Sequence, residues 1–304
     1  MLKEILSSKN ICGVITALIT PFQGSRAANK VNLDKYRELI KLAAEAKLAG
    51  VVALGTTGES PTLNGDERHA IIQTAINAAP EGLAVIVGTG TNNTRTSIEN
   101  TRMAAELGAD GALVVTPYYN KPTPAGLKAH FTAIADASRI PIILYHIPGR
   151  CGVGIPVDLA LKLGEHRNII AIKEAGGNVW RSGEIARQAP ENFAVLSGDD
   201  NLTLPLMSVG VVGVISVISN IKPKLFNHMV QAMLDGRLSE ARELHYKLAP
   251  LLNALSLETN PAPIKEAMNL IGMDTGSVRS PLAGVCSATK KALQVVLEKV
   301  GDDQ

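Results

Sequence analysis

The stretch PIILYHIPGRCGVGIPVDLALKLGEHRNIIAIKE, residues 141–174, decides the fold because a short apolar run lies near each of its ends. Residues 141–145 and 169–172 are apolar at nearly every position rather than at alternate positions. Strands of that kind are buried on both faces, as parallel strands covered by helices are. The intervening segment has room for a crossover helix, so the stretch predicts a strand, a helix and a parallel strand.

The same alternation of β-branched apolar runs and helical segments recurs along the chain on both sides of this stretch. The predicted strands are Gly13–Ile19, Val51–Gly55, Ala84–Val87, Gly111–Val115, Pro141–Tyr145, Ile169–Lys173, Phe193–Ser197 and Val211–Ser216. Helices are expected between them, for instance at 33–48, 66–78 and 94–107. This α/β pattern favours a (β/α)8 TIM barrel, although periodicity alone also permits an open doubly wound sheet.

After the eighth predicted strand the pattern changes to helices alone. These are expected at 223–234, 238–257, 263–271 and 287–300. No linker rich in Gly, Ser or Pro precedes them, so they are expected to pack on the barrel. The predicted organisation is a catalytic barrel at 1–220 and a C-terminal helical region at 221–304.

Composition excludes several classes of function. The 304 residues carry a formal charge of +2 and 3% aromatic residues, which argues against a nucleic-acid partner. No apolar run is long enough to span a membrane, and residues 1–12 lack the apolar core of a secretion signal, so a cytoplasmic protein is expected. Neither the histidines nor Cys12, Cys151 and Cys286 have metal-ligand spacing, so free thiols, no metal and no cofactor are expected.

Barrel enzymes place reactive groups at the C-terminal ends of strands and in the loops that follow. The polar residues at those places are Thr56, Thr57, Tyr118, Tyr119, Tyr145, Lys173, Asp199 and Asp200. The two aspartates are interpreted as helix caps rather than as a metal-binding pair. The remaining residues form the candidate site.

Lys173 closes an otherwise apolar strand. Burial there disfavours the charged ammonium and makes the neutral amine available. Such an amine can attack a ketone to give a protonated imine, which acidifies the adjacent carbon without a metal. The structural alternative is a lysine that extends to solvent or pairs with Glu174.

Tyr145 ends the neighbouring strand, where its phenol could transfer protons within a chain completed by Thr56 and Tyr119. Core packing of the tyrosine and a simple turn at the threonines are the alternatives. Arg150 lies in the loop Pro148–Gly152, where a guanidinium could hold a substrate carboxylate through two hydrogen bonds. A solvated surface arginine is the alternative there.

Six segments occur in a characteristic order. They are Gly55–Ser60, Thr116–Asn120, Tyr145 with Pro148–Arg150, Ile172–Ala175, Gly213–Ser216 and Asn260–Lys265. Together they resemble the dihydrodipicolinate synthase family, within the N-acetylneuraminate lyase superfamily, over nearly the whole chain. The resemblance implies a lyase that condenses pyruvate with L-aspartate 4-semialdehyde to 4-hydroxy-tetrahydrodipicolinate, in the diaminopimelate route of lysine biosynthesis.

The resemblance also implies residue roles. Lys173 would form the imine with pyruvate, without any other cofactor, and Tyr145 would act as acid and base. Thr56 and Tyr119 would complete the proton relay. Pyruvate would also contact Thr57 and the backbone of Ile215, and Arg150 would bind the carboxylate of the aldehyde. In this family Tyr119 reaches across a tight dimer interface, which implies a homotetramer built as a dimer of dimers.

The chain departs from the family pattern at several places. His146 stands where the family usually has Asn, and Cys151 where it has Thr. Ser60, Asn92 and Tyr118 match the site at which lysine inhibits many members, whereas Pro61, Gly65, Arg68 and Thr96 do not. Weak or absent lysine feedback is therefore expected. The rival functions are a sialic acid or sugar-acid aldolase and a catalytically silent barrel.

Overall fold

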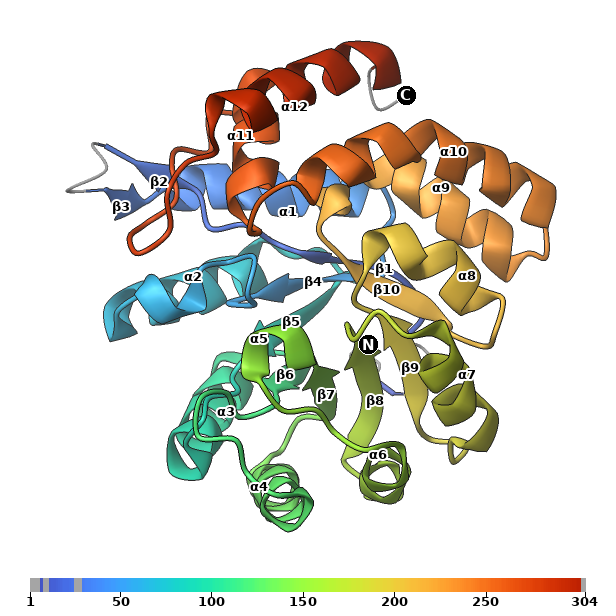
Figure 1. The fold of residues 1–304 in the computed structure, drawn as a ribbon. Helices are drawn as coiled ribbons and strands as arrows, with labels where there is room; N and C mark the ends of the chain where they lie inside the picture. The colour runs from blue at the N-terminus through green and yellow to red at the C-terminus, as the bar shows by residue number, and fades with distance from the viewer. Residues whose placement is uncertain (1–5, 8–10, 25–28, 302–304) are drawn as a thin grey trace. The chain divides into compact units, whose positions relative to one another are not determined.

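The computed structural model describes residues 6–7, 11–24 and 29–301. Within these residues, eight strands form a closed barrel in the order β1-β10-β9-β8-β7-β6-β5-β4 (Figure 1). Paired strands with a defined register run parallel, as in β6–β7 and β7–β8. The predicted TIM barrel is therefore confirmed, and the open sheet is excluded.

The barrel strands are short and almost wholly buried. They are β1 (Gly13–Ala17), β4 (Gly50–Ala53), β5 (Ala84–Gly88), β6 (Gly111–Val115), β7 (Ile142–His146), β8 (Ile169–Glu174), β9 (Ala194–Ser197) and β10 (Gly213–Ser216). Each overlaps a predicted strand. A further antiparallel pair, β2 (Phe22–Gln23) with β3 (Lys30–Val31), was not predicted, because two-residue strands are too short to show a periodic pattern.

Each range at which the sequence predicts a helix overlaps one, and further helices lie between the remaining strands. They are α1 (Leu33–Glu45), α2 (Gly65–Ala78), α3 (Thr94–Leu107), α4 (Pro124–Ala137), α5 (Pro148–Cys151), α6 (Val157–Gly164), α7 (Val179–Gln188), α8 (Thr203–Met207), α9 (Pro223–Leu234), α10 (Leu238–Leu255), α11 (Ala262–Leu270) and α12 (Ser287–Val300). Three 3-10 turns, η1 (Ser60–Thr62), η2 (Asp200–Leu202) and η3 (Ile218–Asn220), lie in the same described part of the chain. Asparagine side chains cap α1, α2, α3 and α7, which fixes where those helices begin.

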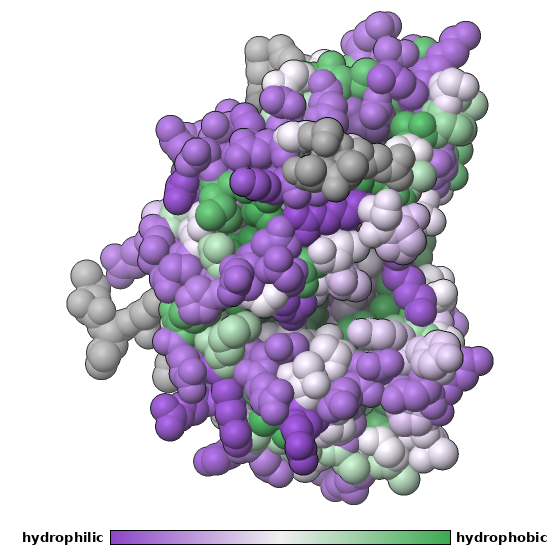
Figure 2. All heavy atoms as spheres, turned by 90° about the vertical axis from the view of Figure 1, so that its left-hand side faces the viewer, coloured by the Kyte–Doolittle hydropathy of each residue, from purple (hydrophilic) through white to green (hydrophobic). Residues whose placement is uncertain are grey.

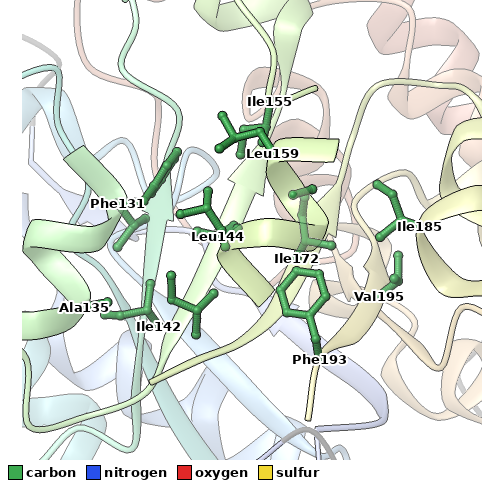
Figure 3. Packing of buried hydrophobic residues seen from close by; sticks show 14 of the residues in the cluster. Phe131, Ala135, Ile142, Leu144, Ile155, Leu159, Ile172, Ile185, Phe193 and Val195 are labelled. Atoms are coloured by element: carbon green, nitrogen blue, oxygen red, sulfur yellow. The ribbon is translucent and has the colours of Figure 1, made fainter. Parts of the chain in front are cut away.

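The chain divides into two compact units. The first comprises Met1–Gly13 and Ala84–Ile215. Its apolar core lies between β6–β9 and the helices that cover them, and Figure 3 shows Phe131, Leu144, Ile172 and Phe193 converging there. This packing fixes the strand ends on which Tyr145 and Lys173 stand.

The second unit comprises Val14–Leu83 and Ser216–Gln304, and so contains the C-terminal helices. Within it, α10 packs on α9 and α12, and α11 packs on η3. The Asn220 side chain in η3 donates to the carbonyl of Ala17 at the end of β1, over 2.8 Å. The helical region therefore packs against barrel residues of its own unit, while the domain boundary at 220/221 stays a prediction.

Figure 2 shows one face of the molecule, on which hydrophilic side chains predominate and hydrophobic ones form small areas. Among the described residues, no helix combines the length and apolar character needed to cross a membrane. Much of the N-terminal stretch behind the cytoplasmic prediction, namely residues 1–5 and 8–10, lies outside the described residues.

Candidate active site

Two neighbouring strands bring Lys173 and Tyr145 together. In the parallel register of β7 and β8, Tyr145 pairs with Lys173 and His146 pairs with Glu174. Because side chains alternate along a strand, Tyr145 and Lys173 share one face of the sheet. The Lys173 Nζ lies 4.3 Å from the centroid of the Tyr145 ring. The predicted amine and the predicted proton carrier are thus in contact.

Lys173 is buried, with 6% of its surface exposed. No hydrogen bond or ion pair to another described residue ends on its Nζ. The alternative pairing with Glu174 is wrong, because Arg181 of α7 holds that carboxylate through two hydrogen bonds of 3.1 Å. The amine is therefore enclosed, and no hydrogen bond or ion pair to the described residues uses its donor positions.

Asp199 supplies a negative charge near the amine. Burial raises the pKa of the Asp199 carboxyl, and the Lys173 ammonium and the Gly177 N–H partly offset that rise. The interpretation of Asp199 and Asp200 as helix caps holds only for the position of Asp199, which is the N-cap residue of η2: its side chain makes no capping hydrogen bond, and Asp200 lies inside η2. Asp199 thus belongs to the electrostatic surroundings of Lys173.

Thr56 and Thr57 lie in a tight turn after β4, in the second unit. The Thr57 side chain is buried, and its Oγ1 accepts a hydrogen bond of 3.0 Å from Asn260 Nδ2. The Thr56 carbonyl accepts from the Glu59 N–H over 3.1 Å. Because Oγ1 of Thr57 is an acceptor toward Asn260, its own hydroxyl hydrogen can be donated to a substrate oxygen.

A buried ion pair that the sequence analysis did not identify supports this turn. Lys265 Nζ lies 2.9 Å from Glu59 Oε1, and both residues are buried. The ammonium also donates to the carbonyls of Thr20 and Ser277. Glu59 Oε2 accepts from the Arg279 backbone N–H over 2.7 Å. The sequence offered one indication of this ion pair. Lys265 is a charged residue in α11, and it is buried there together with most of the helix.

Tyr118 and Tyr119 follow β6, and both side chains are exposed. Tyr119 is 90% exposed and Tyr118 37%. The backbone φ of Tyr119 is +72°, a left-handed conformation that non-glycine residues adopt uncommonly and often at functional sites. Asn120 Nδ2 holds the loop by donating to the Asn92 carbonyl over 2.9 Å.

Arg150 lies on an exposed helical turn, whereas Ile215 lies in a buried strand. The sequence predicted a loop at Pro148–Gly152, and this prediction is wrong for most of the segment. Pro148–Cys151 forms the single helical turn α5, which begins at Pro148. Arg150 is exposed on this turn. Ile215 lies within β10 and is fully buried, so its backbone rather than its side chain is the group available near the strand end.

Metal and redox chemistry would require clustered ligands or reactive thiols. Within residues 6–7, 11–24 and 29–301, no group of three or more His, Cys, Asp or Glu side chains could hold a metal ion. The cysteines Cys12, Cys151 and Cys286 are free thiols, as predicted. Burial raises the pKa of the Cys151 thiol to about 11, which makes it a poor nucleophile near neutral pH.

Comparison with known proteins agrees with this geometry. Residues 10–300 match the model of the dihydrodipicolinate synthetase family. The 4-hydroxy-tetrahydrodipicolinate synthase of Methanococcoides burtonii is 46% identical over 95% of this chain and 98% of its own. That of Methanothrix thermoacetophila is 44% identical over 95% and 97%.

Solved structures agree as well. The dihydrodipicolinate synthase of Aquifex aeolicus has a TM-score of 0.91 and 43% identity, with 95% of this chain and 98% of that chain covered. The family match agrees with the barrel fold and with the lysine and tyrosine at the ends of β8 and β7. The chain belongs to the dihydrodipicolinate synthetase family.

Proposed function

We propose that this chain is a 4-hydroxy-tetrahydrodipicolinate synthase, which condenses pyruvate with L-aspartate 4-semialdehyde through an imine on Lys173. The observation that carries the proposal is the enclosed Lys173 Nζ, 4.3 Å from the ring of Tyr145 and unbonded to other described residues. Family membership supports the choice of substrates.

The chemistry consists of two exchanges at the ketone carbon of pyruvate, with one carbon–carbon addition between them. The neutral amine of Lys173 adds to the ketone carbon of pyruvate and water leaves, which gives a protonated imine. Loss of a methyl proton gives an enamine, whose carbon adds to the aldehyde. The amino group of the second substrate then displaces Lys173 from the former ketone carbon, closing the ring. The condensation is redox-neutral overall, so it requires no redox cofactor.

Protons must reach and leave the reacting atoms during these steps. We assign Tyr145 as the acid and base because its ring contacts Lys173. Thr56 and Tyr119 are proposed to complete the relay. Thr57, through its hydroxyl, and the backbone of Ile215 are proposed to bind the pyruvate carboxylate.

Arg150 is proposed to bind the carboxylate of the aldehyde substrate, which would make it a determinant of substrate choice. The test compares turnover of aspartate semialdehyde with that of N-acetylmannosamine and glyceraldehyde. Arg150→Ala should raise KM for aspartate semialdehyde by roughly tenfold to a hundredfold, the cost of a lost charged hydrogen-bonding partner.

Arg167→Ala is the matched control, because Arg167 is also an exposed arginine but lies just before β8, at the opposite end of the strand from Lys173. It should leave both KM values unchanged. Faster wild-type turnover of a sugar aldehyde than of aspartate semialdehyde would refute the proposed substrate and favour the aldolase alternative.

A homo-oligomer is proposed, with a tetramer built from two dimers. The support is the exposure of large apolar side chains, 90% for Tyr119 and 78% for Trp180, which a second copy could cover. Mixing inactive Lys173→Ala and Tyr119→Phe chains tests this. Recovery of activity on subunit exchange would show that Tyr119 serves the site of its partner, and no recovery with stable mixed oligomers would contradict it.

Weak lysine feedback and a cytoplasmic location are also proposed. Arg68 supports the first, because its Nη1 donates to Ser60 Oγ over 2.8 Å and places a cation beside a residue that matches the lysine site. A second cation is repelled there. Activity should persist in millimolar lysine, and inhibition at micromolar lysine or below would contradict this proposal.

A further inference from the structure

His146 is the last residue of β7 and faces away from the Tyr145 side of the sheet. It is 5% exposed, and its Nδ1 accepts a hydrogen bond of 3.0 Å from the Ile155 N–H. An accepting Nδ1 requires the ring proton to sit on Nε2. Burial, with the charge of Arg181, lowers the pKa of His146 to about 4, so the ring is neutral at physiological pH.

The N–H, the carbonyl and the side chain of Ile155 each make a contact that restrains it. Its N–H is bound by His146, and its carbonyl accepts from Arg181 Nη2 over 2.6 Å. Arg181 is itself fixed by two hydrogen bonds to Glu174, the carboxylate that faces His146 Nε2 at 4.0 Å. The Ile155 side chain packs in the apolar core near Leu159 (Figure 3). These contacts therefore fix the position of the backbone at Ile155.

Ile155 lies five residues after Arg150, and two contacts restrain the start of the chain between them. The Gly152 N–H closes the α5 turn by donating to the Pro148 carbonyl over 2.8 Å. The Cys151 side chain is buried at 3% exposure. Whatever fixes Ile155 thus also fixes the direction in which the chain leaves the turn that carries Arg150.

Two glycines provide the space that the imidazole ring occupies. A Cβ at Gly154 would lie 2.6 Å from His146 Cε1, and a Cβ at Gly176 would lie 3.0 Å from Nε2. An asparagine at 146 has neither of those ring atoms, whereas its Oδ1 stands at the same number of bonds from Cβ as Nδ1 does. It would keep the acceptor for Ile155 and leave room for side chains at 154 and 176.

We propose that His146, Gly154 and Gly176 form one fitted positioning unit, which sets the segment that carries Arg150 and thereby sets KM for the aldehyde substrate. The inference rests on the proposed function of Arg150. It accounts for the histidine in place of the usual Asn: the imidazole Nδ1 supplies the acceptor for Ile155, and Gly154 and Gly176 leave the space that the larger ring occupies.

The central test is a double-mutant cycle between positions 146 and 154, in the full-length protein. Gly154→Ala should raise KM for aspartate semialdehyde by roughly tenfold, because the ring must move and take the Ile155 contact with it. The kcat and the KM for pyruvate should stay within about twofold. In Gly154→Ala combined with His146→Asn, KM for the aldehyde should return to the value of His146→Asn alone.

Gly65→Ala is the matched control, since an added Cβ there meets nothing within 4 Å. His146→Leu is a second probe, because leucine removes the acceptor; it should raise the aldehyde KM, whereas His146→Asn should change it by less than about threefold. If His146→Leu does not fold, the cycle with Gly154 still decides.

The outcomes separate the two proposals. A wild-type protein that does not condense aspartate semialdehyde refutes the proposed function, whatever the variants do. With an active wild type, a Gly154→Ala variant of unchanged aldehyde KM overturns the inference. The inference is also overturned if adding His146→Asn to Gly154→Ala restores the melting temperature but not the aldehyde KM. That result would show that the contact between positions 146 and 154 is purely structural.

Discussion

Two buried lysines in this molecule differ in what their ammonium groups can do. Lys173 and Lys265 are 6% and 1% exposed, and each Nζ lies over an aromatic ring, at 4.3 Å from that of Tyr145 and 4.2 Å from that of Phe22. Lys265 donates to a carboxylate and to two carbonyls within 3.0 Å. Lys173 makes no such bond to the described residues.

The difference shows that burial alone does not make a lysine reactive. Burial lowers the pKa of Lys265 to about 8, so a search for perturbed amines would select it. Yet its three N–H bonds are all used, and no face of the nitrogen is open to a ketone. Lys173 stands at a strand end of the barrel with its donors unused, as a covalent amine must.

Replacing Lys173 gives the largest expected effect and tests the reactive side of the comparison. Lys173→Met should lower kcat/KM for the condensation by about a thousandfold or more, because no other group can form the imine. Its melting temperature should stay close to that of the wild type, since no hydrogen bond is lost. A variant that keeps a tenth of the activity would contradict the assignment.

Replacing Lys265 tests the structural side. Lys265→Met leaves the Glu59 carboxylate buried without its cation and should lower the free energy of unfolding by about 3–5 kcal/mol. Urea denaturation measures the loss. The exposed Lys162, paired with Glu165, is the control, and Lys162→Met should change stability by less than about 1 kcal/mol. Equal effects of the two variants would contradict a structural role for Lys265.

Acid should weaken the unit that holds Lys173. Burial lowers the pKa of His130 and of His146 to about 4, against about 6.5 for an unfolded histidine. Between these values the unfolded chain binds more protons, so the free energy of unfolding falls as pH falls. A loss of roughly 1–3 kcal/mol is expected between pH 6.5 and 5. His146→Asn should remove part of it, and an unchanged pH profile in that variant would count against a buried neutral His146.

The contact between Asn260 and Thr57 gives the smallest expected effect. Asn260→Ala removes the 3.0 Å hydrogen bond to Thr57 Oγ1 and should cost about 1 kcal/mol of stability. It should also raise KM for pyruvate a few fold if Thr57 binds that substrate. In a Thr57→Val background the same substitution should add almost nothing, and full additivity would show that the two side chains act independently.

The sequence predicted the parts of the molecule that depend on local pattern. The strands of the barrel are apolar runs, and a lysine that ends such a run at 173 stands out against it. Because neighbouring parallel strands end at the same edge, the contact between Lys173 and Tyr145 follows from the order of the elements alone. Those predictions needed no knowledge of side-chain packing.

The parts that could not be predicted depend on residues far apart in sequence. Glu59 and Lys265 are 206 residues apart, and nothing near either one indicates its partner. The fit of His146 between Gly154 and Gly176 depends on ring positions at the sub-ångström level. The sequence indicated the position of Asp199 before a helical turn. It could not show that this carboxyl is buried and interacts with the charge of Lys173, which lies on another strand.

The most direct test of the central claim is chemical trapping. The wild-type protein is incubated with pyruvate, reduced with borohydride, digested and analysed by peptide mass spectrometry. We expect a single pyruvate-derived adduct, on the peptide that contains Lys173, and an unmodified Lys265. Absence of an adduct, or an adduct on Lys265 in place of Lys173, would contradict the account.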